Sequence, residues 1–192
     1  PSIKARIGLE ISYRPEREQE IRELLRCYDF DFLIGSIHHI DDWMFDHPSY
    51  FSGYALWDVS ELYQAYFGLV ERMVLSGLFD VVGHLDLVKV FDVRPMEDVR
   101  GYAEASLKAI ARSKMVIEVN TAGLYKPCKE IYPARELLEK CYTMNIPVTL
   151  GSDAHEPEEV ARGFSLAREI LYDVGYRKLT RFVGRQRIYE YF

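Results

Sequence analysis

Short apolar segments alternate with longer amphipathic segments along almost the whole chain, and this alternation limits the folds that the chain can adopt. Six segments are typical of strands, because they are short and rich in apolar and β-branched residues: 5–13, 30–40, 79–87, 114–120, 146–153 and 179–188. Five segments between them are typical of amphipathic helices: 16–27, 59–77, 96–112, 133–144 and 158–174. Strands that alternate with helices predict an α/β fold with a mostly parallel sheet.

Composition narrows the class of protein. A chain of 192 residues with 48% hydrophobic residues can bury a core, and its length fits a single domain over residues 1–192. No apolar run approaches the roughly 20 residues that span a bilayer. The three cysteines, Cys27, Cys128 and Cys141, form no C-x-x-C pair, so we expect reduced thiols and a cytoplasmic location. A net charge of −6 argues against nucleic acid or an acidic membrane as the main partner.

Polar residues follow the apolar bodies of the first five predicted strands. They are potential metal ligands or acids: Glu10, His38, His84 with Asp86, Glu118 with Asn120, and Asp153 with His155. In a barrel of parallel strands the carboxyl ends lie on one rim, where the active sites of such barrels occur. We therefore expect these residues to meet. A shared site explains them better than packing does, because buried ionisable groups are costly without partners.

The stretch 148–155 carries the strongest of these signals. A strand runs into a glycine turn that delivers Asp153 and His155 two positions apart. If the strand geometry persists, the two side chains point the same way, and a carboxylate beside an imidazole suits zinc, iron or manganese. The alternative is that Asp153 caps a helix opening at 156–159 and that His155 lies at the surface.

Each of the other residues also has a structural alternative. Glu10 could form a salt bridge with Arg6 or Arg14. Of the adjacent histidines only one can face the rim, and we choose His38, which shares a strand face with Ser36. We expect His39 either to support the ligands from behind or to pack elsewhere. His84 could be an ordinary core histidine. Asp86 could orient its ring or cap a turn, and Glu118 and Asn120 could line the floor of the site or only hydrogen-bond strand ends.

Five motifs in this order resemble the PHP superfamily, and most closely its histidinol-phosphatase branch. They are Gly-Leu-Glu at 8–10, Gly-Ser-Ile-His at 35–38 with Trp-x-Phe-Asp-x-Pro at 43–48, Val-Gly-His-Leu-Asp-Leu at 82–87, Glu-Val-Asn-Thr-Ala-Gly at 118–123 and Gly-Ser-Asp-Ala-His at 151–155. Segments 126–133 and 146–149 resemble the same branch rather than polymerase-associated PHP domains.

The resemblance implies a distorted seven-stranded β/α barrel, similar to a TIM barrel, that binds two or three divalent metal ions and hydrolyses a phosphomonoester. Glu10 would bridge two metals, His38 and His84 would bind one of that pair, Asp153 would bind the other, and His155 would help to bind the third. Glu10 and Asp153 would thus be the catalytic carboxylates. Lys126 would contact the phosphate, unless it is a solvated surface lysine. The aromatic loop 41–54 would cover an imidazole-bearing substrate.

The chain departs from the family at its beginning, because the His-x-His motif expected before Glu10 is not in the sequence. We therefore expect an incomplete barrel that lacks roughly 70 residues, going by typical β/α unit lengths. The expected reaction is hydrolysis of L-histidinol phosphate to L-histidinol and phosphate in histidine biosynthesis. The alternatives are a PHP-type nuclease or nucleotide phosphoesterase, or a non-catalytic metal-binding fragment.

Overall fold

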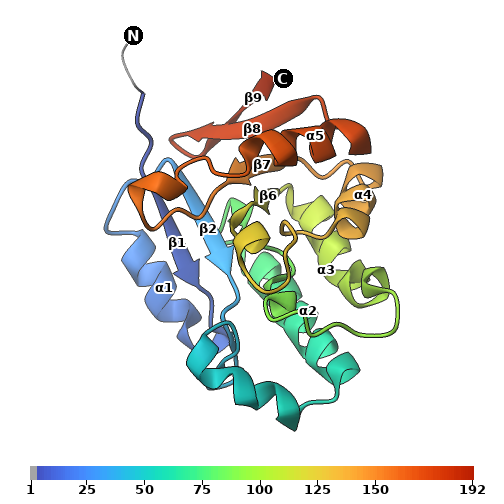
Figure 1. Cartoon of the computed structure of the whole chain (residues 1–192). Coiled ribbons are helices and arrows are strands. Elements are labelled where there is room, and N and C mark those ends of the chain that lie inside the picture. The colour runs from blue at the N-terminus through green and yellow to red at the C-terminus, as the bar shows by residue number, and fades with distance from the viewer. Residues whose placement is uncertain (1–3) are drawn as a thin grey trace.

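The computed structural model describes residues 4–192 and contains the expected parallel sheet (Figure 1). Five strands run in one direction and pair in chain order: β1 (Gly8–Ser12), β2 (Phe32–Ser36), β5 (Val81–Val82), β6 (Val116–Asn120) and β7 (Val148–Gly151). Their carboxyl ends therefore lie at the same edge of the sheet. Residues 4–192 form an open sheet with β1 and β7 at its edges, so a closed barrel stays a prediction.

Four helices connect these strands: α1 (Glu18–Leu25), α2 (Val59–Leu75), α3 (Val99–Ser113) and α4 (Arg135–Thr143). A fifth helix, α5 (Phe164–Val174), follows β7. The start of α2 is fixed by Asp58, whose carboxylate accepts hydrogen bonds from the backbone N–H groups of Ser60 and Glu61. Its buried face repeats every three or four residues through Leu62, Tyr66 and Val70 and packs against α3 (Figure 1). Within residues 4–192 no helix has the length and apolar composition needed to cross a bilayer.

The sixth predicted strand, within 179–188, is one half of a two-stranded hairpin and does not join the parallel sheet. The chain makes an antiparallel hairpin there, β8 (Lys178–Val183) and β9 (Gln186–Tyr191), which is a sheet of its own. Gly184 and Arg185 form the turn with φ values of 53° and 62°, a conformation that suits a tight hairpin. The Arg185 guanidinium pairs with Asp80 at 2.9 Å, just before β5. The hairpin therefore covers the amino-terminal end of the parallel strands (Figure 1).

Loop 41–54 is more ordered than its length suggests. Strands β3 (His39–Ile40) and β4 (Trp43–Met44) pair, and a 3-10 helix, η2 (Pro48–Leu56), follows. The Trp43 ring packs edge-on against Tyr54, with centroids 4.8 Å apart. Aromatic packing thus gives this segment a defined shape at the end of the molecule opposite the hairpin (Figure 1).

Four shorter 3-10 helices complete the connections: η1 (Pro15–Arg17), η3 (Leu87–Lys89), η4 (Ala122–Tyr125) and η5 (Pro157–Glu159). They explain where the predicted elements were too long. The predicted strand 79–87 shrinks to β5 because the chain turns toward η3. The predicted helix 158–174 begins only at Phe164, because Ala161 and Gly163 have φ values of 61° and 76°, which are incompatible with a helix.

Candidate metal site

Six of the residues predicted for the site line one cavity of about 550 Å³ at the carboxyl ends of the strands, whereas Asp86, Glu118 and Asn120 do not line it. The six are Glu10, His38, His84, Lys126, Asp153 and His155. They come from β1, from the residue that follows η4 and from the turns after β2, β5 and β7, so their convergence is a property of the parallel sheet.

Three of these residues form a close cluster. One ligand atom each from Glu10, His38 and His84 lies within 4.8 Å of the other two. Oε1 of Glu10 is 3.2 Å from Nε2 of His84 and 3.8 Å from Nε2 of His38. Ser36 on β2 donates a hydrogen bond of 2.7 Å to the same Glu10 oxygen. Glu10 thus faces the histidines, and the predicted alternative of a salt bridge to Arg6 or Arg14 is wrong.

Only one of the two adjacent histidines lines the cavity, although β2 ends at Ser36, before both of them. His38 faces the cavity, whereas His39 belongs to β3, pairs with Met44 and lines a different hollow. The rings of His38 and His84 are 5.0 Å apart and meet edge-on.

His84 is almost completely buried, with 3% of its surface exposed. Its backbone N–H donates to Oε2 of Glu118 at 3.1 Å, and its ring packs against Tyr132 at 6.2 Å. Neither predicted role of Asp86 is right. Its carboxylate does not contact the His84 ring and makes no side-chain cap; it pairs with Lys89 instead.

The surroundings of the cluster favour an ionised Glu10 and a neutral His38, which are the forms that bind metals. Burial alone would raise the pKa of Glu10, but the hydrogen bonds and charge of His84, with Ser36 and His38, lower it to about 2. Burial and the neighbouring His84 lower the pKa of His38. Burial would also lower the pKa of His84, but the hydrogen bond and charge of Glu10 raise it to about 9. The His84 ring would have to lose its proton before it could bind a cation.

Asp153 and His155 reach the cavity by a different route from the predicted one. Strand β7 ends at Gly151, and Asp153 has a left-handed φ of 51°, so strand alternation does not persist to these residues. The Asp153 carboxylate accepts a hydrogen bond from Asn120 at 3.3 Å and caps no helix. The side chain of His155 is 82% exposed, and its Nδ1 is 3.8 Å from Oδ1 of Asp153.

Glu118 and Asn120 connect the two halves of the site. The Asn120 amide donates to Oε2 of Glu118 at 3.0 Å as well as to Asp153. Glu118 in turn accepts from the backbone of His84. Burial raises the pKa of Glu118. These two residues on β6 therefore link the backbone after β5, at His84, to the turn after β7, at Asp153.

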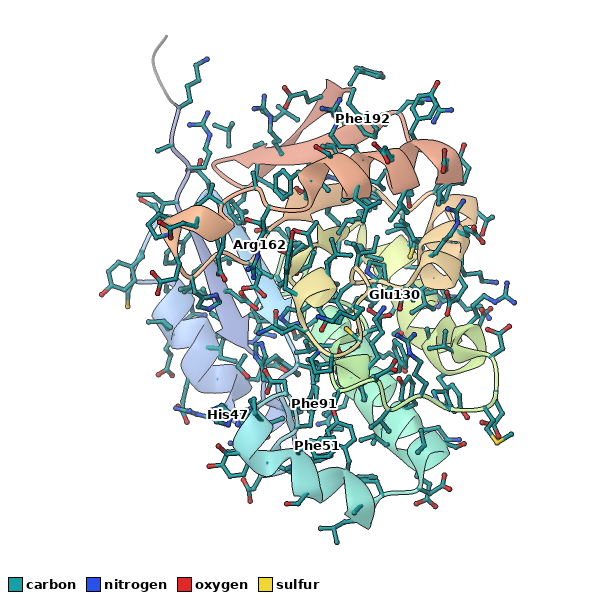
Figure 2. The ribbon with its side chains drawn as sticks, viewed as in Figure 1. His47, Phe51, Phe91, Glu130, Arg162 and Phe192 are labelled. Atoms are coloured by element: carbon teal, nitrogen blue, oxygen red, sulfur yellow. The ribbon has the colours of Figure 1, made fainter. Side chains whose placement is uncertain are left out.

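Sequence reasoning assigned no role to Asp46, which also lines the cavity. Its Oδ1 is buried and has no hydrogen-bond partner among the described residues. His47 lines the cavity beside it, and Figure 2 shows His47 at the same end of the molecule as Phe51 and Phe91, whose rings are 5.2 Å apart. The Trp-x-Phe-Asp-x-Pro motif was the available signal for Asp46, but the sequence alone does not show which of its residues faces inward.

Comparison with known proteins shows the family of this chain. The family profile of the PHP domain matches residues 2–122, which is more than half of the chain. The chain belongs to the PHP family. This PHP chain is 40% identical over 178 residues to a probable histidinol-phosphatase of Deinococcus radiodurans, covering 93% of the chain and 68% of the relative. It is 29% identical over 193 residues to a probable histidinol-phosphatase of Schizosaccharomyces pombe, covering 92% of the chain and 62% of the relative.

A solved structure shares the fold of this PHP chain. It is the histidinol phosphate phosphatase of Lactococcus lactis, in complex with zinc, L-histidinol and phosphate. The TM-score is 0.76 at 23% sequence identity, over 97% of this chain and 72% of that one. The PHP chain thus spans roughly two thirds of the length of several histidinol-phosphatase relatives.

The cluster in this PHP chain fits a metal ion on its own geometry. One carboxylate oxygen and two imidazole nitrogens are the ligand types of zinc, iron and manganese, and their spacing lets one ion contact all three. Asp153 and His155 line the same cavity but are not part of this three-residue cluster. The ligand roles of the five residues remain predictions.

Proposed function

We propose that the protein carrying this chain hydrolyses L-histidinol phosphate to L-histidinol and phosphate in histidine biosynthesis. The observation that carries the proposal is the convergence of Glu10, His38, His84, Asp153 and His155 on one cavity. The 40% identity to a probable histidinol-phosphatase supports the choice of substrate. We further propose one domain over residues 1–192, a barrel-type closure of the sheet, and a cytoplasmic location.

The proposed cofactors are two or three divalent ions, for which zinc is supported by the Lactococcus lactis complex and iron or manganese suit the same ligands. When bound, such ions activate water as Lewis acids and neutralise the charge that develops on a phosphate ester. The residues of the chain hold and orient the reactants. Glu10, on β1, and Asp153, in the turn after β7, would supply the anionic ligands. This placement supports their proposed roles as the catalytic carboxylates.

The rest of the cavity suits a small phosphorylated substrate that also carries a cationic group. Among the described residues that line it, Lys126 is the only lysine or arginine, and we assign it to the phosphate. The buried Oδ1 of Asp46 supplies a hydrogen-bond acceptor for an ammonium or imidazolium group. A single lysine does not form the extended basic track that an oligonucleotide backbone requires, so the cavity favours a monoester over a nucleic acid.

The test measures phosphate release from L-histidinol phosphate with zinc, manganese or iron(II), before and after chelation. We expect metal-dependent turnover that exceeds turnover of glycerol phosphate, which lacks a cationic group for Asp46. Asp153→Ala should abolish turnover and leave the circular dichroism spectrum unchanged. The matched control is Asp173→Ala, an exposed position on α5, which should keep normal activity. Turnover that survives Asp153→Ala would show that the site is wrongly assigned, and cleavage of oligonucleotides instead would favour a nuclease.

A further inference from the structure

Lys89 is a buried lysine that the proposed chemistry does not use. It lies at the end of η3, and its side chain is 3% exposed. Its ammonium contacts Oδ2 of Asp86 at 2.8 Å, Oε2 of Glu130 at 2.9 Å and the carbonyl oxygen of Ile131 at 2.9 Å. An ammonium group at this depth is costly to bury unless it is fully paired, so losing any one of these contacts would destabilise the others.

The contacts of Lys89 converge on one short segment, 130–134. Lys89 holds the Glu130 side chain and the Ile131 carbonyl at the start of the segment. Asp86, its ion-pair partner, accepts a hydrogen bond of 2.9 Å from the backbone N–H of Ala134 at the other end. Figure 2 marks Glu130 beside the loop that follows β6. The Lys89–Asp86 pair therefore clamps both ends of segment 130–134.

The centre of this segment is Tyr132, which lines the metal-site cavity. Tyr132 is 1% exposed, and its ring packs between the Lys89 ammonium, 5.3 Å from the ring centroid, and the His84 ring. The backbone of Tyr132 exchanges two hydrogen bonds, of 2.7 and 2.9 Å, with Asn120. The side chain of Asn120 is the one that holds Asp153 and Glu118. A shift of the segment would thus reach His84 through the Tyr132 ring and Asp153 through Asn120.

We infer that Lys89 is a positioning residue of the active site, which fixes Tyr132 against His84 and keeps Asn120 in register with Asp153. This inference rests on the proposed function only where kcat/KM is measured; zinc affinity and the His84 resonance test it independently. Lys89 itself does not line the cavity and so acts through its neighbours. Outer residues that orient metal ligands typically change metal affinity or activity by about 10- to 100-fold when they are replaced.

The experiment replaces Lys89 by Met, which keeps the length of the side chain and removes the charge. We expect Lys89→Met to lower zinc affinity, measured by chelator competition, at least tenfold, and to lower kcat/KM about 10- to 100-fold. Ring resonances of the five histidines give a spectroscopic readout in the metal-free protein: His84 should shift and His47 should not. Lys108→Met is the matched control, because Lys108 forms an exposed ion pair with Glu104, and it should leave all three readouts unchanged.

A folded Lys89→Met variant with unchanged zinc affinity and an unmoved His84 resonance would overturn the inference. If this variant does not fold, Glu130→Gln is the second test, since it removes one charge from a side chain that is 28% exposed and keeps its shape. It should lower zinc affinity at least threefold, and an unchanged affinity would equally overturn the inference. A wild-type protein that binds zinc but releases no phosphate from L-histidinol phosphate would reject the proposed function, while zinc affinity and the His84 resonance would still test Lys89.

Discussion

Gly151 ends β7 where the side chain of Glu118 crosses beside it. A Cβ added to Gly151 would overlap Oε1 of Glu118. Glu118 could not move away without cost, because its other oxygen holds the His84 backbone and the Asn120 amide. Glycine is needed here for close approach, and its backbone conformation plays no part.

We therefore expect Gly151→Ala to displace Glu118, to destabilise the fold by about 1–3 kcal/mol and to weaken zinc binding. Gly68→Ala is the control, because Gly68 lies within α2 with open space around it, and alanine there should stabilise the helix by up to about 1 kcal/mol. Urea unfolding and zinc titration of both variants measure the effects. A Gly151→Ala protein as stable as the wild type would mean that Glu118 is not held as described.

Sequence patterns reached the site residues unevenly. Strand parity chose the histidine that lines the cavity, His38 and not His39, but β2 ends at Ser36, so the alternation it relied on does not extend to either residue. The same rule brought Asp153 and His155 to the rim for a wrong reason, because β7 ends before them. Asp46 and Lys89 were assigned no role: their surroundings come from segments distant in sequence, which no local pattern reports.

At the scale of elements, the β8–β9 hairpin closes the end of the sheet opposite the cavity. The Phe182 side chain is 6% exposed and packs with Val81 and Val116 at the starts of β5 and β6. The sequence predicted all five parallel strands, because each lies within a short apolar segment between two amphipathic or polar segments. The hairpin was missed because its two strands were read as one through Gly184, although that glycine was the signal of a turn.

Phe182→Ala should reduce the free energy of unfolding by about 3 kcal/mol, since it removes a large buried side chain. Val183→Ala, at a position 39% exposed on the same strand, should change it by less than about 0.5 kcal/mol. Activity per folded molecule should stay normal in both variants, because the hairpin lies away from the metal site. Urea unfolding combined with kinetics at low temperature checks this, and a lower kcat in folded Phe182→Ala would contradict the separation of the two ends.

At the scale of the whole molecule, metal binding should stabilise the fold, because the ligands are brought together only in the folded chain. Zinc at about 100 times its dissociation constant contributes about 2.7 kcal/mol. This corresponds to a rise of roughly 5–10 °C in Tm for a chain of this size. Glu10→Gln should remove most of the rise, whereas Glu16→Gln, an exposed position outside the cavity, should keep it. Thermal unfolding by circular dichroism, with zinc and with a chelator, measures the shift. An equal rise in Glu10→Gln would place the ion elsewhere.

The candidate ligands are spread from Glu10 to His155 along the chain and come from the ends of separate strands. No short stretch of this polypeptide contains a complete set, so a detached peptide could not capture an ion with the same geometry. Retention of zinc would consequently report the assembly of the entire sheet. Local unfolding of any one strand that contributes a ligand would therefore release the ion before the rest of the molecule unfolds.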